Sequence, residues 1–183
     1  MPSIYMNNYV FSQKDYESGD GMLTQVWGPG LWHSLHTISF NYPVHPTQQQ
    51  KREYKAFMLS LANVLPCRAC RINLKKNYKA NPITQKDLKN RAAFSRYVFR
   101  LHESINKLLG KKSGLSYNDV RERYEHFRAR CPKAGGDRNS EIGCVKSEYG
   151  KKTRCLLRIV PTTDQCKTLV IDKKCKFKTR RKL

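Results

Sequence analysis

Two cysteines separated by two residues, Cys67 and Cys70, form the sharpest chemical signal in the chain. Two thiols at this spacing can close a small disulfide ring or provide two thiolate ligands to a metal ion. A zinc site needs a second pair of ligands, and none of the other cysteines of the chain forms a C-x-x-C. An inert, half-buried pair is the remaining alternative. We favour a redox-active dithiol.

The residues around this pair indicate that it lies on helices. A thioredoxin-type site places its C-x-x-C after a strand, whereas the segment before Cys67 has helical periodicity. If Cys70 lies in the first turn of a helix, backbone N–H groups and the helix dipole should lower the pKa of its thiol. Arg68 and Arg71 add positive charge nearby.

Two further pairs have the i, i+4 spacing of residues on one helical face: Trp32 with His36, and His102 with Asn106. Indole and imidazole rings, together with a carboxamide, can hold a flat heteroaromatic cofactor by stacking and hydrogen bonding. Each residue alone also has a plain structural explanation. Trp32 and the histidines could be parts of a packed core, and Asn106 could face water.

The apolar spacing predicts an all-α fold that would position these residues. The predicted helices cover residues 28–41, 48–65, 67–78, 85–109 and 117–130. Pro29 suits the first turn of the first helix, and Gly110 should end the fourth. The expected N-caps are Thr47, Thr84 and Ser116.

The composition of the chain predicts four parts. Residues 1–24 are polar and should form a loose arm, whereas residues 25–131 carry the helical pattern. Residues 132–143 read as a linker, and residues 144–183 form a basic module with 13 basic and 3 acidic side chains.

This C-terminal module contains two short runs that resemble strands, residues 155–160 and 168–171. So short a segment cannot bury a large core, so we expect it to be cross-linked or to bind a metal. Its four cysteines allow structural disulfides, a shuttle pair or a zinc knot, and we favour disulfides; they are Cys144, Cys155, Cys166 and Cys175.

The formal net charge of +22 predicts attraction to polyanions such as nucleic acid and to acidic protein surfaces. The sequence contains no helix-turn-helix, paired zinc finger or aromatic RNA-binding signature, so we expect only nonspecific contact through the basic tail. No apolar run is long enough for a membrane span. The first residues resemble neither a signal peptide nor a transit peptide, so a cytoplasmic protein is expected.

Taken together, these motifs resemble those of the Erv/ALR family of FAD-linked sulfhydryl oxidases. The resemblance covers about residues 28–124, over half of the chain. The tail is most similar to the versions encoded by large DNA viruses, which implies a location in host cytoplasm, virus factory or virion. The matching pieces, in family order and with family gaps, are Trp32-x-x-Leu35-His36, Tyr42-Pro43, Pro66-Cys67-x-x-Cys70-Arg71 and His102-x-x-x-Asn106-x-x-Leu109-x-Lys111.

The resemblance implies a four-helix bundle with a short fifth helix, which holds FAD at its mouth and forms a homodimer. Cys70 would be the thiol beside the flavin, and Cys67 would exchange with the dithiols of protein substrates or of a thioredoxin-like carrier. Electrons would then pass through FAD to O2, giving H2O2. The residues implied to bind FAD are Trp32, His36, Tyr42, Cys70, His102, Asn106, Lys111 and Tyr124.

Three features depart from the family pattern. Glu103 stands where an asparagine often follows the histidine of the fourth helix. Ser113 and Ser116 lie near the position of a family cysteine, so Cys131 would need another partner, such as Cys144. No cysteine precedes the C-x-x-C, so substrates either reach it directly or use a tail pair as a shuttle.

A basic, zinc-containing nucleic-acid-binding module is the alternative function. It would account for the cysteines and the charge of the chain. It does not account for the spacing of the Trp32–His36 and His102–Asn106 pairs, so we favour the oxidase.

Overall fold

The computed structural model describes residues 10–128, 154–161, 163–164 and 169–176. Within these ranges the chain forms helices and no strand. The elements are α1 (Gln13–Tyr16), α2 (Thr24–Phe40), α3 (Gln48–Val64), α4 (Arg68–Ala80), α5 (Arg91–Leu108), α6 (Tyr117–Glu125) and the short 3-10 helix η1 (Lys173–Cys175).

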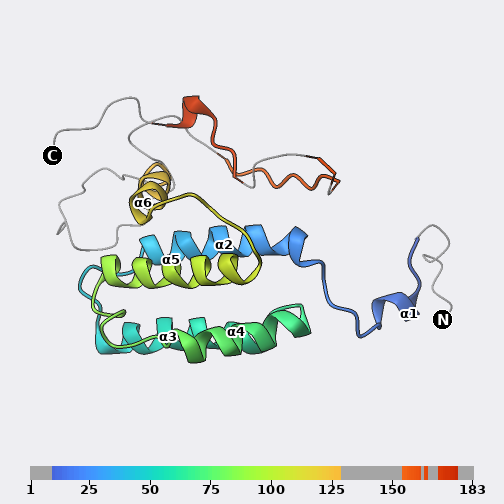
Figure 1. The fold of residues 1–183 in the computed structure, drawn as a ribbon, viewed down its shortest axis with the longest axis horizontal. Helices are drawn as coiled ribbons and strands as arrows, with labels where there is room; N and C mark the ends of the chain where they lie inside the picture. Colours follow the sequence, from blue (N-terminus) through green and yellow to red (C-terminus); the bar gives the residue numbers. More distant parts are fainter. Residues whose placement is uncertain (1–9, 129–153, 162, 165–168, 177–183) are drawn as a thin grey trace, which may run out of the picture.

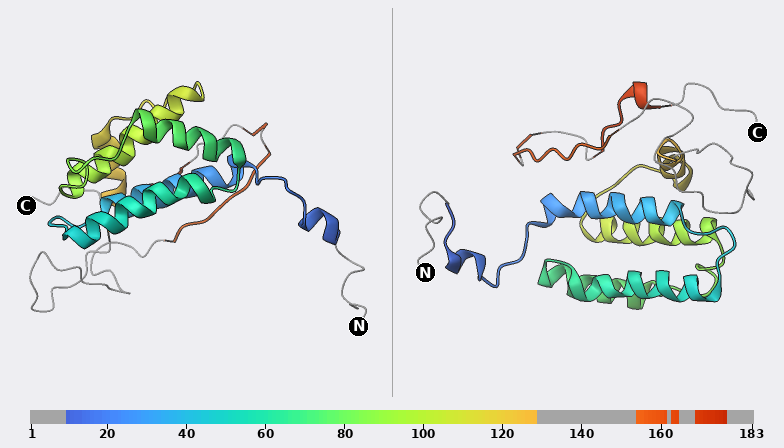
Figure 2. Two further views of the ribbon diagram at one scale, coloured as in Figure 1. Left: turned by 90° about the horizontal axis from the view of Figure 1, so that it is seen from below. Right: turned by 180° about the vertical axis from the view of Figure 1, so that it is seen from behind.

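Helices α2 to α5 form a four-helix bundle in two layers (Figure 1). Helix α2 packs against α5 in one layer and α3 packs against α4 in the other, while contacts between α4 and α5 join the layers. Helix α6 packs on α2, outside the bundle. The view from behind shows the same two layers (Figure 2, right). The predicted bundle with a short fifth helix is therefore confirmed.

One face of α5 forms the centre of the core. Phe94, Tyr97, Val98 and Leu101 recur at helical spacing, and at most 1% of each side chain is exposed. They pack with Leu35 and with residues of α3 and α4 in a single apolar cluster. Burial of this face holds α5 in place and so fixes the positions of its other side chains.

Helix α2 begins at Thr24, earlier than predicted, so that Pro29 lies inside it. Proline has no N–H to donate to the carbonyl group four residues before it. Pro29 and Gln25 are both exposed, so water can replace the missing bond. The earlier start brings Thr24 to the end of the bundle where α4 also begins.

Helix α5 begins later than predicted. The expected cap, Thr84, does cap a turn, because the Asp87 N–H donates to its hydroxyl and its own N–H donates to the Asp87 carboxylate. The helix itself starts after Asn90, whose side chain accepts from the Ala93 N–H at 2.9 Å. Two successive caps therefore stand where the sequence predicted one.

Other expectations for the helix ends are confirmed. Thr47 and Ser116 each form a capping box at the start of α3 and α6. Gly110 follows the end of α5 with a φ of 67°, a conformation that glycine adopts without strain. Within the predicted arm, the chain forms the short capped helix α1.

The strand predicted at residues 155–160 is wrong, because this segment pairs with no other described residues and the side chains of Leu156, Leu157 and Ile159 are exposed. Residues 169–171 form no strand either. The linker, Cys131, Cys144 and Cys166 lie outside the described residues, so the boundaries of the linker and the basic module remain predictions. No helix in the part of the chain that the structure describes is both long and apolar enough to cross a membrane.

Tyr42 joins the end of α2 to the turn before α5. Its hydroxyl donates to the Leu88 carbonyl at 2.9 Å, and its own carbonyl accepts from Arg91 Nε at 2.6 Å. The ring has no exposed surface and packs against Tyr54 and Phe94.

We therefore expect Tyr42→Phe to lower the free energy of unfolding by about 1–3 kcal/mol, because the buried Leu88 carbonyl loses its partner. Denaturant unfolding curves measure this change. Tyr16→Phe is the matched control, since Tyr16 is 85% exposed and should give an unchanged midpoint. Equal midpoints for the two variants would contradict the assignment of Tyr42 to the core.

A candidate redox site at the end of the helical bundle

The two cysteines of the C-x-x-C meet at the start of α4. Pro66 and the extended backbone of Cys67 end the preceding segment, and Cys67 is the N-cap of α4. Its sulfur accepts a hydrogen bond from the Cys70 N–H at 3.3 Å. Both residues are half-buried free thiols, so the pair is arranged for reversible disulfide formation.

The sequence predicted a lowered pKa for Cys70, but in the structure the pKa of Cys67 is lowered and that of Cys70 is raised. Hydrogen bonds from the Cys70 thiol and the Cys70 N–H lower the pKa of Cys67. Burial raises the pKa of Cys70, and its hydrogen bond to the Cys67 sulfur raises it further. Helix α4 begins one residue after Cys67. Cys67 at the cap position therefore receives the backbone hydrogen bond, and Cys70, the third residue of the helix, does not.

A short segment before and at the start of α2, residues 21–24, lies across this motif. The Met22 N–H donates to the Pro66 carbonyl at 2.8 Å, and the Thr24 hydroxyl lies 3.3 Å from the Cys70 sulfur. Trp27 Nε1 donates to the Met22 carbonyl at 3.1 Å and so fixes the segment to α2. Sequence reasoning missed these residues, because nothing in their types or spacing connects them to a motif that lies far along the chain.

Aromatic and imidazole rings gather between α2 and α5. Trp32 and His102 stack with centroids 3.9 Å apart and planes 4° from parallel. His36 Nε2 lies 3.0 Å from His102 Nδ1, which is a hydrogen bond between the two imidazoles. Trp32 and Cys70 both pack against the main core cluster. The structure thus brings together Trp32, His36 and His102, as predicted.

Burial keeps both imidazoles neutral. It lowers the pKa of His36 to about 3 and that of His102 to about 4, and the neighbouring ring adds to the effect at His36. A neutral imidazole has one donor and one acceptor nitrogen, so the pair can share a single proton along its bond. His36 Nδ1 is buried and has no hydrogen-bond partner, so one polar atom in this group is available to a ligand.

Tyr124 of α6 closes the same group from the other side. Its ring lies 5.4 Å from His36 and 5.2 Å from Phe40, and its hydroxyl lies 3.3 Å from His33 Nδ1. His33 and Phe40 were not predicted. A search for i, i+3 and i+4 neighbours of His36 would have found both.

The predicted residues at the C-terminal end of α5 form a separate polar edge. The Asn106 side chain donates to Glu103 at 2.9 Å, and the Asn106 carbonyl accepts from the Lys111 N–H at 2.8 Å. Glu103, one of the departures from the family pattern, thus positions the asparagine amide. Lys107, Lys111 and Lys112 supply three cations in this turn, whose charge suits phosphate groups.

Tyr42 is the exception among the predicted cofactor residues. It is fully buried in the core, where it contacts Tyr54 and Phe94, and its hydroxyl is bonded to the Leu88 carbonyl. The structure therefore gives the Tyr42 side chain a role in the core, and its predicted contact with FAD stays a prediction.

The remaining residues fit FAD. The Trp32 and His102 rings are stacked on one another and are of the flat kind that can extend a stack onto a heteroaromatic ring. His36 Nδ1 is an unpaired buried atom, and the lysines after α5 match the charge of a diphosphate. Neutral imidazoles can stack on and hydrogen-bond to a ring without adding charge.

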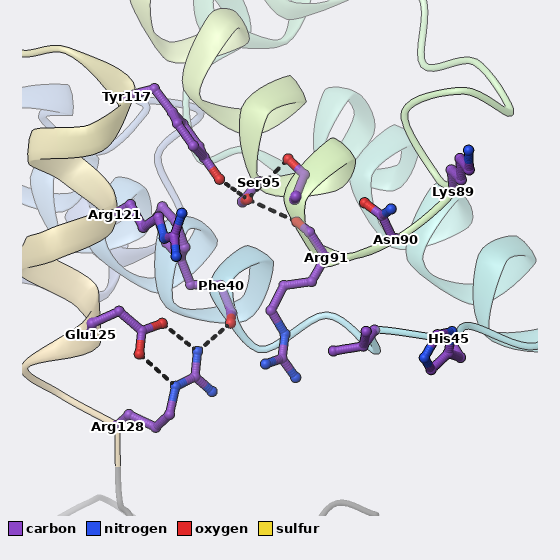
Figure 3. Close-up of a pocket in the computed structure, with 12 residues that line it drawn as sticks. Phe40, His45, Lys89, Asn90, Arg91, Ser95, Tyr117, Arg121, Glu125 and Arg128 are labelled. Atoms are coloured by element: carbon purple, nitrogen blue, oxygen red, sulfur yellow. Dashed lines mark hydrogen bonds and ion pairs between the residues drawn. The ribbon is translucent and has the colours of Figure 1, made fainter. Parts of the chain in front are cut away.

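A pocket of about 600 Å³ lies elsewhere, between the end of α2, the start of α5, and α6 (Figure 3). Two of its three arginines are engaged with the protein: Arg91 donates to the Tyr42 carbonyl, and Arg128 donates to the Phe40 carbonyl and to Glu125. Neither cysteine lines it, so it is not part of the redox site.

Within the described residues, no group of three or more His, Cys, Asp or Glu side chains is arranged to hold a metal ion. Cys155 and Cys175 are free thiols. Nothing in this part of the chain supports the zinc-module alternative.

Comparison with known proteins gives a consistent result. Residues 29–125 match the model of the Erv1 / Alr family. The chain is 33% identical over 104 residues to a probable FAD-linked sulfhydryl oxidase of Acanthamoeba polyphaga mimivirus, a match that covers 57% of this chain and 72% of that protein. It is 34% identical over 84 residues to the FAD-linked sulfhydryl oxidase ERV1 of Arabidopsis thaliana, covering 46% of this chain but only 42% of the plant protein.

The fold agrees with a solved structure. The FAD-binding domain of Erv1 from Saccharomyces cerevisiae superposes with a TM-score of 0.52 at 28% identity, covering 57% of this chain and 95% of that domain.

The buried imidazoles predict an acid-sensitive fold. Between pH 6.5 and about 4, the unfolded chain binds protons on His36 and His102 that the folded chain does not bind. Stability should therefore fall as the pH falls, with a slope of up to about 2.7 kcal/mol per pH unit from the two groups.

Unfolding of the cofactor-free protein between pH 5 and 6 measures this slope. His102→Gln should reduce it by about half, whereas His45→Gln, at an exposed loop position, should leave it unchanged. Identical slopes for the two variants would refute the buried, neutral state of His102.

Proposed function

Because the chain belongs to the Erv1 / Alr family, we propose that it is an FAD-linked sulfhydryl oxidase that forms disulfide bonds in protein thiols. One observation carries the proposal: the free thiols at the start of α4 and the ring group of α2 and α5 border the same core cluster, since Cys70 and Trp32 both pack against it. The names of the mimivirus and plant relatives describe the same activity.

Cys67 is the residue that exchanges with the substrate. A substrate thiolate attacks its sulfur in the oxidised pair, the S–S bond breaks, and the electron pair leaves on the Cys70 sulfur. The second substrate thiolate then attacks the mixed disulfide and releases Cys67 as a thiolate. The lowered pKa of Cys67 makes it the better leaving group in this second step.

The outcome is a disulfide in the substrate and a reduced Cys67–Cys70 pair, so two electrons have entered the protein. When bound, FAD supplies a two-electron acceptor that regenerates the disulfide and passes the electrons to O2, giving H2O2. Trp32 and His102 would hold its ring system, His36 and Tyr124 would flank it, and the lysines after α5 would hold its phosphates.

The substrates we infer are the dithiols of proteins or of a thioredoxin-like carrier, because Cys67 is partly exposed and so within reach of another molecule. We further propose that the protein is a homodimer located in host cytoplasm or virion. Its net charge of +22 supports nonspecific contact with polyanions through the basic tail.

The visible absorption spectrum of the purified protein tests this function. We expect flavin absorbance that bleaches on addition of a dithiol and recovers in air as oxygen is consumed. A colourless protein that also fails to take up added FAD would overturn the proposal.

Cys70→Ser should abolish dithiol-dependent oxygen uptake, by at least about 10³-fold, because no internal disulfide can form. FAD content should be retained, since the rings and lysines are unchanged. Cys155→Ser is the matched control, because Cys155 is an exposed free thiol outside the bundle, and it should keep full activity. Normal oxygen uptake by Cys70→Ser would sink the assignment of the redox pair.

A further inference from the structure

The segment of residues 21–24, which we call the strap, carries the next inference. It is held at three points: the Met22 N–H on the Pro66 carbonyl, Trp27 Nε1 on the Met22 carbonyl, and the Thr24 hydroxyl beside the Cys70 sulfur. Two of these contacts reach the C-x-x-C or the proline before it, and the third fixes the strap to α2. The strap therefore belongs to the redox site, although it contains no cysteine.

Glycine at position 21 makes this close approach possible. A Cβ added there would lie 2.9 Å from the Pro66 carbonyl oxygen and 3.3 Å from the Cys67 Cα. Both neighbours are backbone atoms that cannot rotate away, so any larger residue would push the strap off the motif. Gly19, two residues earlier, has nothing within 4 Å of the same added atom.

The Thr24 hydroxyl and the Cys70 sulfur are 3.3 Å apart, and either can donate while Cys70 is a thiol. Once Cys70 is a thiolate, only the hydroxyl has a proton to donate. Burial disfavours that thiolate and raises the pKa of Cys70, whereas the contact with Thr24 acts in the opposite direction. The Cys67 and Thr24 side chains both affect the pKa of Cys70, whereas the Arg71 side chain donates to the Leu65 carbonyl.

We propose that Thr24 is a catalytic residue of the exchange reaction, whose hydroxyl donates a hydrogen bond to the Cys70 sulfur as it leaves, and that the strap holds it in place. The inference rests on the proposed function. When the substrate thiolate attacks Cys67, the S–S bond breaks and the negative charge moves to the Cys70 sulfur. The hydroxyl stabilises that charge and keeps its own proton, so no further reactant is needed.

The titration of Cys70 tests this role without using oxidase activity. In a Cys67→Ser background, the introduced serine keeps an N-cap oxygen for the Cys70 N–H, and the pH dependence of iodoacetamide alkylation reports Cys70. Adding Thr24→Val should raise the apparent pKa of Cys70 by about one unit, because a hydrogen bond to a charged group is lost. Thr24→Ser keeps the hydroxyl and should restore the original profile.

The same substitutions in the FAD-loaded protein with both cysteines test the effect on exchange. Thr24→Val should slow reduction of the Cys67–Cys70 disulfide by a dithiol about tenfold, and Thr24→Ser should not. Gly21→Ala should act like Thr24→Val on both measurements, whereas Gly19→Ala should act on neither. Unchanged circular dichroism and FAD content show that the fold is retained.

The outcomes separate this inference from the proposed function. If Thr24→Val and Thr24→Ser give the same alkylation profile as the parent while dithiol-dependent oxygen uptake persists, the role of Thr24 is wrong and the oxidase stands. If the alkylation profile shifts as expected but the parent protein consumes no oxygen, the oxidase is wrong and the Thr24–Cys70 hydrogen bond stands.

Discussion

The burial of one face of α5 is the constraint on which the rest of the structure depends. Phe94, Tyr97, Val98 and Leu101 fix this helix against both layers of the bundle. His102 directly follows the last of them, so the core that stabilises the helix also sets the position of the imidazole. Groups carried by a rigid helix can be placed more accurately than groups on a loop. The stacking of His102 on Trp32 is therefore a consequence of packing that extends along the whole of α5.

The site places two kinds of polar group in opposite surroundings. The imidazoles of His36 and His102 are buried, neutral and bonded to each other, which removes the need for a counter-ion. The thiols lie nearer the surface, where Cys67 receives backbone hydrogen bonds and stays accessible for exchange. If both imidazoles were charged, they would repel each other, and the charges would disfavour the binding of an uncharged flat ring beside them. The division thus suits a site that binds a heteroaromatic ring on one side and exchanges disulfides on the other.

Local signals in the sequence were sufficient for much of this structure. The i, i+4 pairs placed Trp32 with His36, and the polar residues before apolar runs identified Thr47 and Ser116 as caps. The sequence was insufficient where two local signals competed, as at Thr84 and Asn90, or where tertiary packing tolerated Pro29 within a helix. The resemblance to the family implied that Tyr42 binds the cofactor, whereas in the structure its hydroxyl donates to the Leu88 carbonyl within the core. The contact between Thr24 and Cys70 joins residues far apart in the chain, and neither residue type predicts it.

Both tryptophans of the chain lie at the redox site. Trp27 holds the strap through the Met22 carbonyl, and Trp32 stacks on His102. The chain has no other indole, so its tryptophan fluorescence originates entirely from the strap and the ring stack. The emission is therefore an optical reporter of events at the strap and at the ring stack, and Tyr124 of α6 borders that stack through His36.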